Sequence, residues 1–132
     1  MNAIDRPRSP DLQVWKWHLT MVLSITHRAS GMLLAAGSGA LAFWLICAAL
    51  GPDQYAIAQA FFRSPVGVAL LMLWSWSLFF HLCNGVRHLF WDAVKGYELP
   101  TAFASAWAVL VVSSALTIIS WAFGFLVVGG AS

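Results

Sequence analysis

Three long apolar stretches separated by short polar segments dominate the chain, covering roughly residues 21–50, 66–94 and 101–128. A helix needs about 20 apolar residues to cross a bilayer, and each stretch is long enough. The pattern predicts an all-α membrane protein whose three transmembrane helices occupy residues 21–132. A polar arm over residues 1–20 is expected at the inner interface.

Glycine, proline and serine mark the expected helix ends. Gly51-Pro52 should end the first helix, because glycine suits the position after a helix and proline cannot continue one. Ser64 can cap the second helix, and Pro65 suits its first position. Residues 55–63 have weak amphipathic character and predict a short helix on the membrane surface.

Small and hydroxylated residues predict how the spans pack. Gly31, Gly37 and Gly39 offer small surfaces for close contact between helices. The third stretch carries no charged residue and no histidine. Its serine and threonine hydroxyls can bond to their own backbone, so this helix is expected to pack and seal.

Composition supports a membrane protein, since 61% of the 132 residues are hydrophobic and only 9% are charged. A soluble domain carries about 25% charged residues. The net charge of +2, without a basic cluster, argues against nucleic-acid binding. Cys47 and Cys83 form no CxxC pair and are expected to be small buried hydrophobes. A polar, proline-containing segment precedes the first apolar stretch, so no cleavable signal peptide is expected.

The lysines and arginines predict an orientation. Only Arg63 belongs to the first loop, and the C-terminal tail has none. The others lie in or near the N-terminal flank and the second loop: Arg6, Arg8, Lys16, Arg28, Arg87 and Lys95. Cytoplasmic loops carry the excess of positive residues. We therefore expect the N-terminus inside and the C-terminus outside.

His81 lies inside the second apolar stretch, where an imidazole without a partner costs free energy to bury. An ionisable side chain inside a membrane span is by default a functional-site hypothesis. In a helix, His81, Gly85 and His88 share one face, at i, i+4 and i+7. Gly85 would let a large flat ligand such as haem lie against the backbone. A histidine that only hydrogen-bonds a neighbouring helix fits these residues equally well.

A second polar group lies on the first predicted helix, where Ser24, His27, Arg28 and Gly31 share a face. With the orientation above, this face lies in the inner half of the bilayer and looks toward a second polar helix. Arg28 keeps its charge, so it either reaches the interface or pairs with an anion such as a haem propionate. Ser24 or Arg28 could donate to a quinone carbonyl.

The inner end of the second span is also polar, because Arg87, His88 and Asp92 lie there. His81 should be about 16 Å deeper than Asp92, at 1.5 Å per residue. The sequence has no glycine-rich nucleotide loop, no cysteine set for an iron–sulfur cluster and no paired carboxylates. An independent active site is therefore not expected, and electrons for any redox chemistry must arrive from a partner.

Two separated motifs carry a family resemblance. The first combines RPRSPDLQ at residues 6–13 with SITHRASG at residues 24–31, and the second is HLCNGVRHLFWD at residues 81–92. Together they resemble the cytochrome b membrane-anchor subunit of succinate dehydrogenase, respiratory complex II. The third apolar stretch matches this family only in being an apolar span.

The resemblance implies a haem b shared between this anchor and a second three-helix anchor, with one axial histidine from each. It places the iron ligand at His81, puts His27 and Arg28 near the propionates, and makes His88 a secondary contact. His27 could in principle supply the other axial ligand, but its expected position nearer the inner surface than His81 favours a partner chain.

The resemblance further implies a quinone site at Ser24 and Arg28, with Trp15 on its approach. Partners would be the iron–sulfur and flavoprotein subunits on the inner face, so the chain would contribute to succinate:quinone oxidoreductase without a dehydrogenase site of its own. We expect ubiquinone as substrate and a bacterial inner membrane rather than a mitochondrial one. Alternatives are a haem-free structural anchor, a fumarate reductase anchor, and an oligomeric transporter, which would need polar residues along a whole pore.

Overall fold

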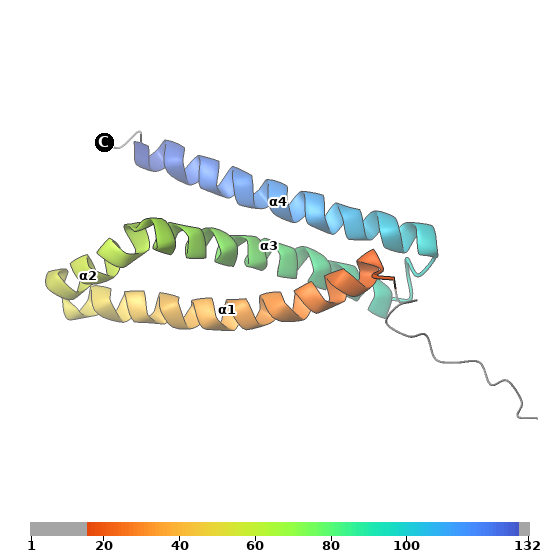
Figure 1. The fold of residues 1–132 in the computed structure, drawn as a ribbon, viewed down its shortest axis with the longest axis horizontal. Coiled ribbons are helices and arrows are strands. Elements are labelled where there is room, and N and C mark those ends of the chain that lie inside the picture. The colour runs from red at the N-terminus through yellow and green to blue at the C-terminus, as the bar shows by residue number, and fades with distance from the viewer. Residues whose placement is uncertain (1–15, 130–132) are drawn as a thin grey trace, which may run out of the picture.

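The computed structural model describes residues 16–129, and nearly all of them are helical (Figure 1). In chain order the helices are α1 (Leu19–Leu50), α2 (Pro52–Arg63), α3 (Pro65–Asp92) and α4 (Leu99–Gly129). Helices α1, α3 and α4 are each long and apolar enough to cross a membrane. The prediction of an all-helical protein with three such helices is confirmed.

Helix α3 lies between α1 and α4 and packs against both. Figure 1 shows α1 and α3 antiparallel and joined at one end by α2, near which the C-terminal end of α4 also lies. The start of α1 and the turn between α3 and α4 lie at the opposite end. This arrangement is the one that three successive spans require.

The predicted helix ends agree with the structure at the first two connections. Gly51 has a φ of 131°, where a side chain would be strained, and Pro52 begins α2. The Ser64 hydroxyl accepts a hydrogen bond from the Gly67 amide at 3.1 Å, and Pro65 occupies the first position of α3. The short helix expected over residues 55–63 is confirmed and begins slightly earlier.

Helix α4 begins at Leu99, before the predicted start at residue 101. Pro100, which the prediction placed in the turn, is the second residue of this helix. A proline is tolerated there because the first amides of a helix have no carbonyl to bond within it. Helix α1 likewise begins at Leu19, so the end of the predicted polar arm is helical.

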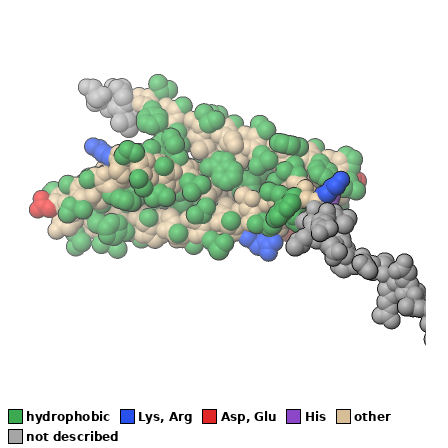
Figure 2. Space-filling view, viewed as in Figure 1, with side chains coloured by type: hydrophobic (Ala, Val, Ile, Leu, Met, Phe, Trp, Pro, Cys, Tyr) green, Lys and Arg blue, Asp and Glu red, His purple; other side chains and the backbone are tan. Residues whose placement is uncertain are grey.

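The buried core is small and lies where α1, α3 and α4 meet. It consists of Leu23, Phe80, Ala106 and Val109. Apolar side chains are spread over the whole face shown in Figure 2, where charged ones are sparse. An apolar surface of this extent marks contact with a membrane or with another protein. The three long helices therefore present their sides to lipid or to a partner.

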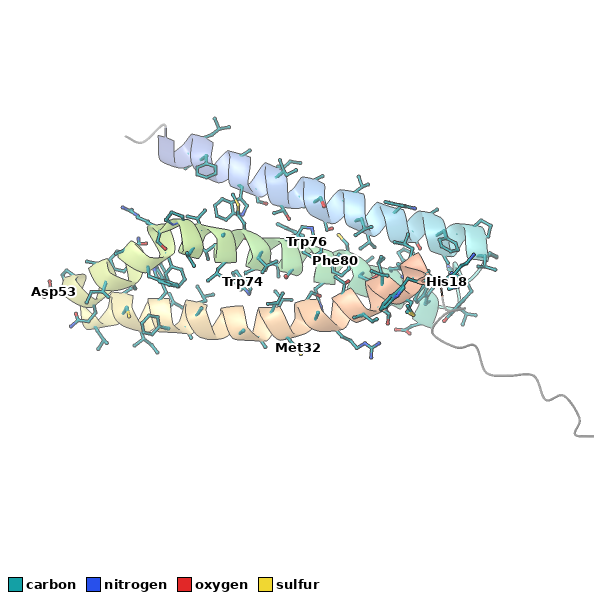
Figure 3. The ribbon with its side chains drawn as sticks, in the orientation of Figure 1. His18, Met32, Asp53, Trp74, Trp76 and Phe80 are labelled. Carbon is teal, nitrogen blue, oxygen red and sulfur yellow. The ribbon has the colours of Figure 1, made fainter. Side chains whose placement is uncertain are left out.

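Two glycines of α1 receive ring side chains from α3, as expected for small residues at a helix crossing. The Trp74 ring lies on Gly37 so closely that a methyl group there would overlap it, and its Nε1 donates to the Leu34 carbonyl at 3.4 Å. Figure 3 shows Trp74 between α1 and α3. Gly31 similarly faces His81. Gly39 was wrongly predicted to make such a contact, because nothing in the described chain lies within 4 Å of a Cβ built there.

Gly37 contacts the Trp74 ring, whereas a Cβ at Gly39 meets nothing among the residues described, so alanine should affect the two positions differently. Gly37→Ala should destabilise the α1–α3 pair by about 1–3 kcal/mol, because the added methyl displaces the Trp74 ring. Thermal unfolding of the purified protein in mild detergent, followed by tryptophan fluorescence, measures the effect.

The matched control is Gly39→Ala, which should change stability by less than about 0.5 kcal/mol because its methyl meets open space. Equal effects from the two alanines would show that Trp74 does not seat on Gly37.

Candidate functional site

Three imidazole rings stack where α1 and α3 cross. The ring of His27, on α1, lies between those of His81 and His88 on α3. Its centroid is 4.0 Å from that of His81 and 5.1 Å from that of His88, with interplanar angles of 18° and 17°. Positions seven apart on a helix rise about 10.5 Å, which leaves room for one ring between them. The predicted common face of His81 and His88 is confirmed.

His81 is held from one side of its ring by the backbone and a hydroxyl of α1. Its Nδ1 lies 3.0 Å from the Ser30 hydroxyl oxygen and 3.3 Å from the His27 carbonyl oxygen. A Cβ at Gly31 would lie only 3.3 Å from His81 Cε1. The ring therefore rests against α1, and its Nε2 makes no hydrogen bond to residues 16–129.

The other two histidines differ in their hydrogen bonds. The Nδ1 of His88 lies 2.7 Å from the Asn84 carbonyl oxygen on its own helix, and its ring meets Trp91 edge to face. The Nδ1 of His27 is buried without a hydrogen-bond partner in the described chain, as are both side-chain polar atoms of Asn84. Buried polar atoms are normally paired, so these three atoms are exceptions within the described chain.

The side of α3 next to His81 is open. A Cβ built at Gly85, one turn away, meets nothing within 4 Å in the described part of the protein. Leucines that share this side are exposed, namely Leu78, Leu82 and Leu89. An imidazole with an unused Nε2, a glycine beside it and apolar flanks fit a haem ligated through His81. The space predicted at Gly85 is therefore present.

The predicted polar face of α1 is divided in the structure. His27 and Gly31 face α3, whereas Ser24 and Arg28 are exposed, and Arg28 Nε donates to the Ser24 carbonyl at 3.4 Å. The expectation that all four face the second polar helix is wrong for Ser24 and Arg28. Helix α3 contacts the side of α1 that carries His27 and Ser30. Because successive positions on a helix are about 100° apart, Ser24 and Arg28 lie beside this contact and stay uncovered. Trp15 lies outside the described residues.

Arg87 does not join the polar cluster with His81 and His88. It turns toward α4, where Nε donates to the Ser105 hydroxyl at 2.9 Å and Nη2 donates to the Ala102 carbonyl at 3.0 Å. Its guanidinium carbon lies 4.0 Å above the Trp91 ring, and the residue is only 6% exposed. Six positions beyond His81, Arg87 lies about 120° around the helix from it, which explains the different neighbour.

Three residues of this region were given no role from the sequence. Ser30 touches His81, and Asn84 is fully buried. The Ser105 hydroxyl bonds to its own backbone, as the sequence allowed, and also accepts from Arg87. Ser30 could have been found from its position three residues after His27, beside Gly31. No local signal marks the other two, because their contacts depend on how α3 rotates against its neighbours.

Three helices of membrane-spanning length, with a histidine cluster between two of them, define a small integral membrane protein. Residues 2–120 match the family model described as succinate dehydrogenase/fumarate reductase transmembrane subunit. The chain belongs to this family.

Individual relatives cover nearly the whole chain. The succinate dehydrogenase cytochrome b556 subunit of Paracoccus denitrificans is 37% identical over 120 residues, which is 91% of this chain and 92% of the relative. The subunit of the same name from Rickettsia felis is 36% identical over 116 residues, 88% and 90% of the two chains. The mitochondrial cytochrome b560 subunit of Mus musculus is 36% identical over 114 residues, 83% of this chain and 66% of its own.

The Arg87–Ser105 contact generates a second prediction. Arg87→Met, Ser105→Ala and the double variant should show a coupling energy of about 0.6–1.7 kcal/mol, the range of hydrogen bonds between membrane helices. Unfolding of the purified protein in mixed micelles by a graded denaturing detergent measures the three free-energy changes.

A control cycle combines Arg87→Met with Ser38→Ala. The Ser38 hydroxyl donates only to the Leu34 carbonyl of its own helix, at 2.9 Å, so these effects should add. Additive effects for Arg87 and Ser105 as well would contradict the contact between α3 and α4.

Proposed function

We propose that this chain is the haem b-binding membrane anchor of a succinate:quinone oxidoreductase, with His81 as one axial ligand of the haem iron. The observation that carries the proposal is the setting of His81, whose ring is held through Nδ1 while Nε2 is unused beside the open space at Gly85. The cytochrome b names of the relatives support a haem. When bound, the haem supplies a one-electron redox centre close to the inner end of the spans.

The second axial ligand comes from a partner anchor. The rings of His27 and His81 stack face to face with centroids 4.0 Å apart, which leaves no space for a haem between them. A haem held by His81 would therefore take its other protein ligand from outside this pair. His27 also lies between His81 and His88, nearer than His81 to the α3–α4 turn, which is the inner end in the proposed orientation.

Three polar residues serve the haem propionates. The guanidinium of Arg28 is exposed and carries a permanent charge, so it can form charge-assisted hydrogen bonds with a carboxylate. His27 contributes the buried Nδ1 that has no partner among residues 16–129. His88 is a secondary contact that orients His27 by stacking on it.

Ubiquinone binds at the uncovered edge of α1 formed by Ser24 and Arg28. The Ser24 hydroxyl donates a hydrogen bond to one quinone carbonyl, and Arg28 stabilises negative charge that develops on a quinone oxygen during reduction. Both described side chains are exposed at the edge of the α1–α3 contact, which suits a site completed by another subunit.

The chain tethers an iron–sulfur subunit and a flavoprotein subunit to the inner face, and these partners supply the electrons. The N-terminus and the α3–α4 turn lie inside, while α2 and the C-terminus lie outside on the membrane surface. Relatives from Rickettsia and Paracoccus support a bacterial inner membrane. The family also includes fumarate reductases, but the relatives reported above are all named succinate dehydrogenase, which favours succinate oxidation.

His81→Ala in the assembled complex should abolish the b-type absorption band, because the iron loses its ligand from this chain. Optical difference spectra and haem content per complex measure the loss. The control is His18→Ala, which removes an exposed histidine that makes no capping hydrogen bond at the start of α1. An unchanged band in the His81 variant would remove it as ligand.

Ser24→Ala should lower the rate of quinone reduction about tenfold, the size expected for losing a neutral hydrogen bond. Arg28→Leu should lower it about ten- to a hundredfold, because a charged hydrogen bond is lost. Succinate oxidation with a soluble acceptor that bypasses the quinone site should be unchanged. Ser38→Ala and Arg63→Leu are matched controls on exposed sites of α1 and α2. Normal quinone reduction in both site variants would refute the assignment.

A further inference from the structure

The Ser30 hydroxyl has a single proton, and its position shows where that proton goes. Its oxygen lies 2.7 Å from the carbonyl oxygen of His27, which can only accept a hydrogen bond. The Ser30 proton therefore points to this carbonyl. Toward His81, at 3.0 Å, the same oxygen is left to act as an acceptor.

The proton count fixes the form of the His81 ring. The two oxygens within hydrogen-bond distance of His81 Nδ1, those of the Ser30 hydroxyl and the His27 carbonyl, both accept in this arrangement. The proton of the neutral imidazole must then reside on Nδ1, which leaves the lone pair on Nε2. This is the tautomer that binds a metal through Nε2.

The surroundings keep this arrangement in place. Ser30 is 2% exposed, so water does not compete for its hydroxyl. A Cβ at Gly31 would already crowd His81 Cε1 at 3.3 Å, so the absence of a side chain there lets the ring approach Ser30. The other serines on α1 lack this geometry, because Ser24 and Ser38 are exposed.

We propose that Ser30 is a positioning residue that sets the tautomer, the orientation and the basicity of His81 as an iron ligand. The proposal rests on the function proposed above. A hydrogen bond accepted from the second ring nitrogen makes imidazole a stronger donor to a metal and fixes its orientation. A stronger donor favours ferric over ferrous haem, so Ser30 lowers the reduction potential of the haem.

The test uses the complete complex, purified in mild detergent, with Ser30→Ala, Ser30→Thr and Ser38→Ala compared with the unchanged protein. Potentiometric titration of the b-type band gives the midpoint potential, and resonance Raman spectra report the bond between iron and histidine. Ser30→Ala should keep the haem, and its preference for ferric over ferrous iron should fall about tenfold. This is the lower end of the effects seen when a residue that hydrogen-bonds a metal ligand is removed. This change raises the midpoint potential by about 59 mV for one electron.

Ser30→Thr retains a hydroxyl and should restore the original potential. Ser38→Ala, which also removes a hydroxyl bonded to its own helix, should leave the potential unchanged. An unchanged potential in Ser30→Ala, or an equal shift in Ser38→Ala, would overturn the role of Ser30. So would loss of haem from both Ser30 variants in normally assembled complexes, because that outcome indicates packing rather than a hydrogen bond.

These outcomes are separate from a failure of the proposed function. If the unchanged complex lacks a b-type band, or if His81→Ala retains it, the haem assignment itself is wrong. If the band is present and depends on His81 while Ser30→Ala titrates normally, the haem assignment stands and the role of Ser30 does not.

Discussion

Two ring side chains of α3 seated on two glycines of α1 hold the structure in register. Trp74 lies on Gly37 and His81 lies on Gly31, so the contacts are six residues apart on one helix and seven apart on the other. Because the helices are antiparallel, this pairing also brings His27 between the rings of α3. Membrane helices gain little from apolar contact with each other, so close packing at small residues supplies the association.

Polar side chains of α3 divide between its two neighbours. The histidines meet α1, whereas Arg87 and the Nε1 of Trp76 reach hydroxyls of α4. A polar group in a bilayer must find its partner within the protein. Helix α3 therefore holds the bundle together through polar contacts to α4 on one side and to α1 on the other.

Local patterns were enough to predict the three spans, the break at Gly51, the cap at Ser64 and the common face of His81 and His88. Each depends on spacing or on a turn residue within one segment. Gly37 and Gly39 are indistinguishable by such rules, yet only Gly37 meets a ring from α3. The uncovered edge at Arg28 and the hydrogen bond of Ser30 to His81 also depend on helix rotation and register, which long-range contacts determine.

The histidine cluster lies entirely on α1 and α3, and no residue of α4 belongs to it. Synthesis proceeds from the N-terminus at about 5–20 residues per second, so the 31 residues of α4 take on the order of 2–6 seconds more. The helical hairpin of α1 and α3 can therefore close in the nascent chain before the last span leaves the ribosome. The histidine cluster can in this way assemble during translation, before the final span is complete.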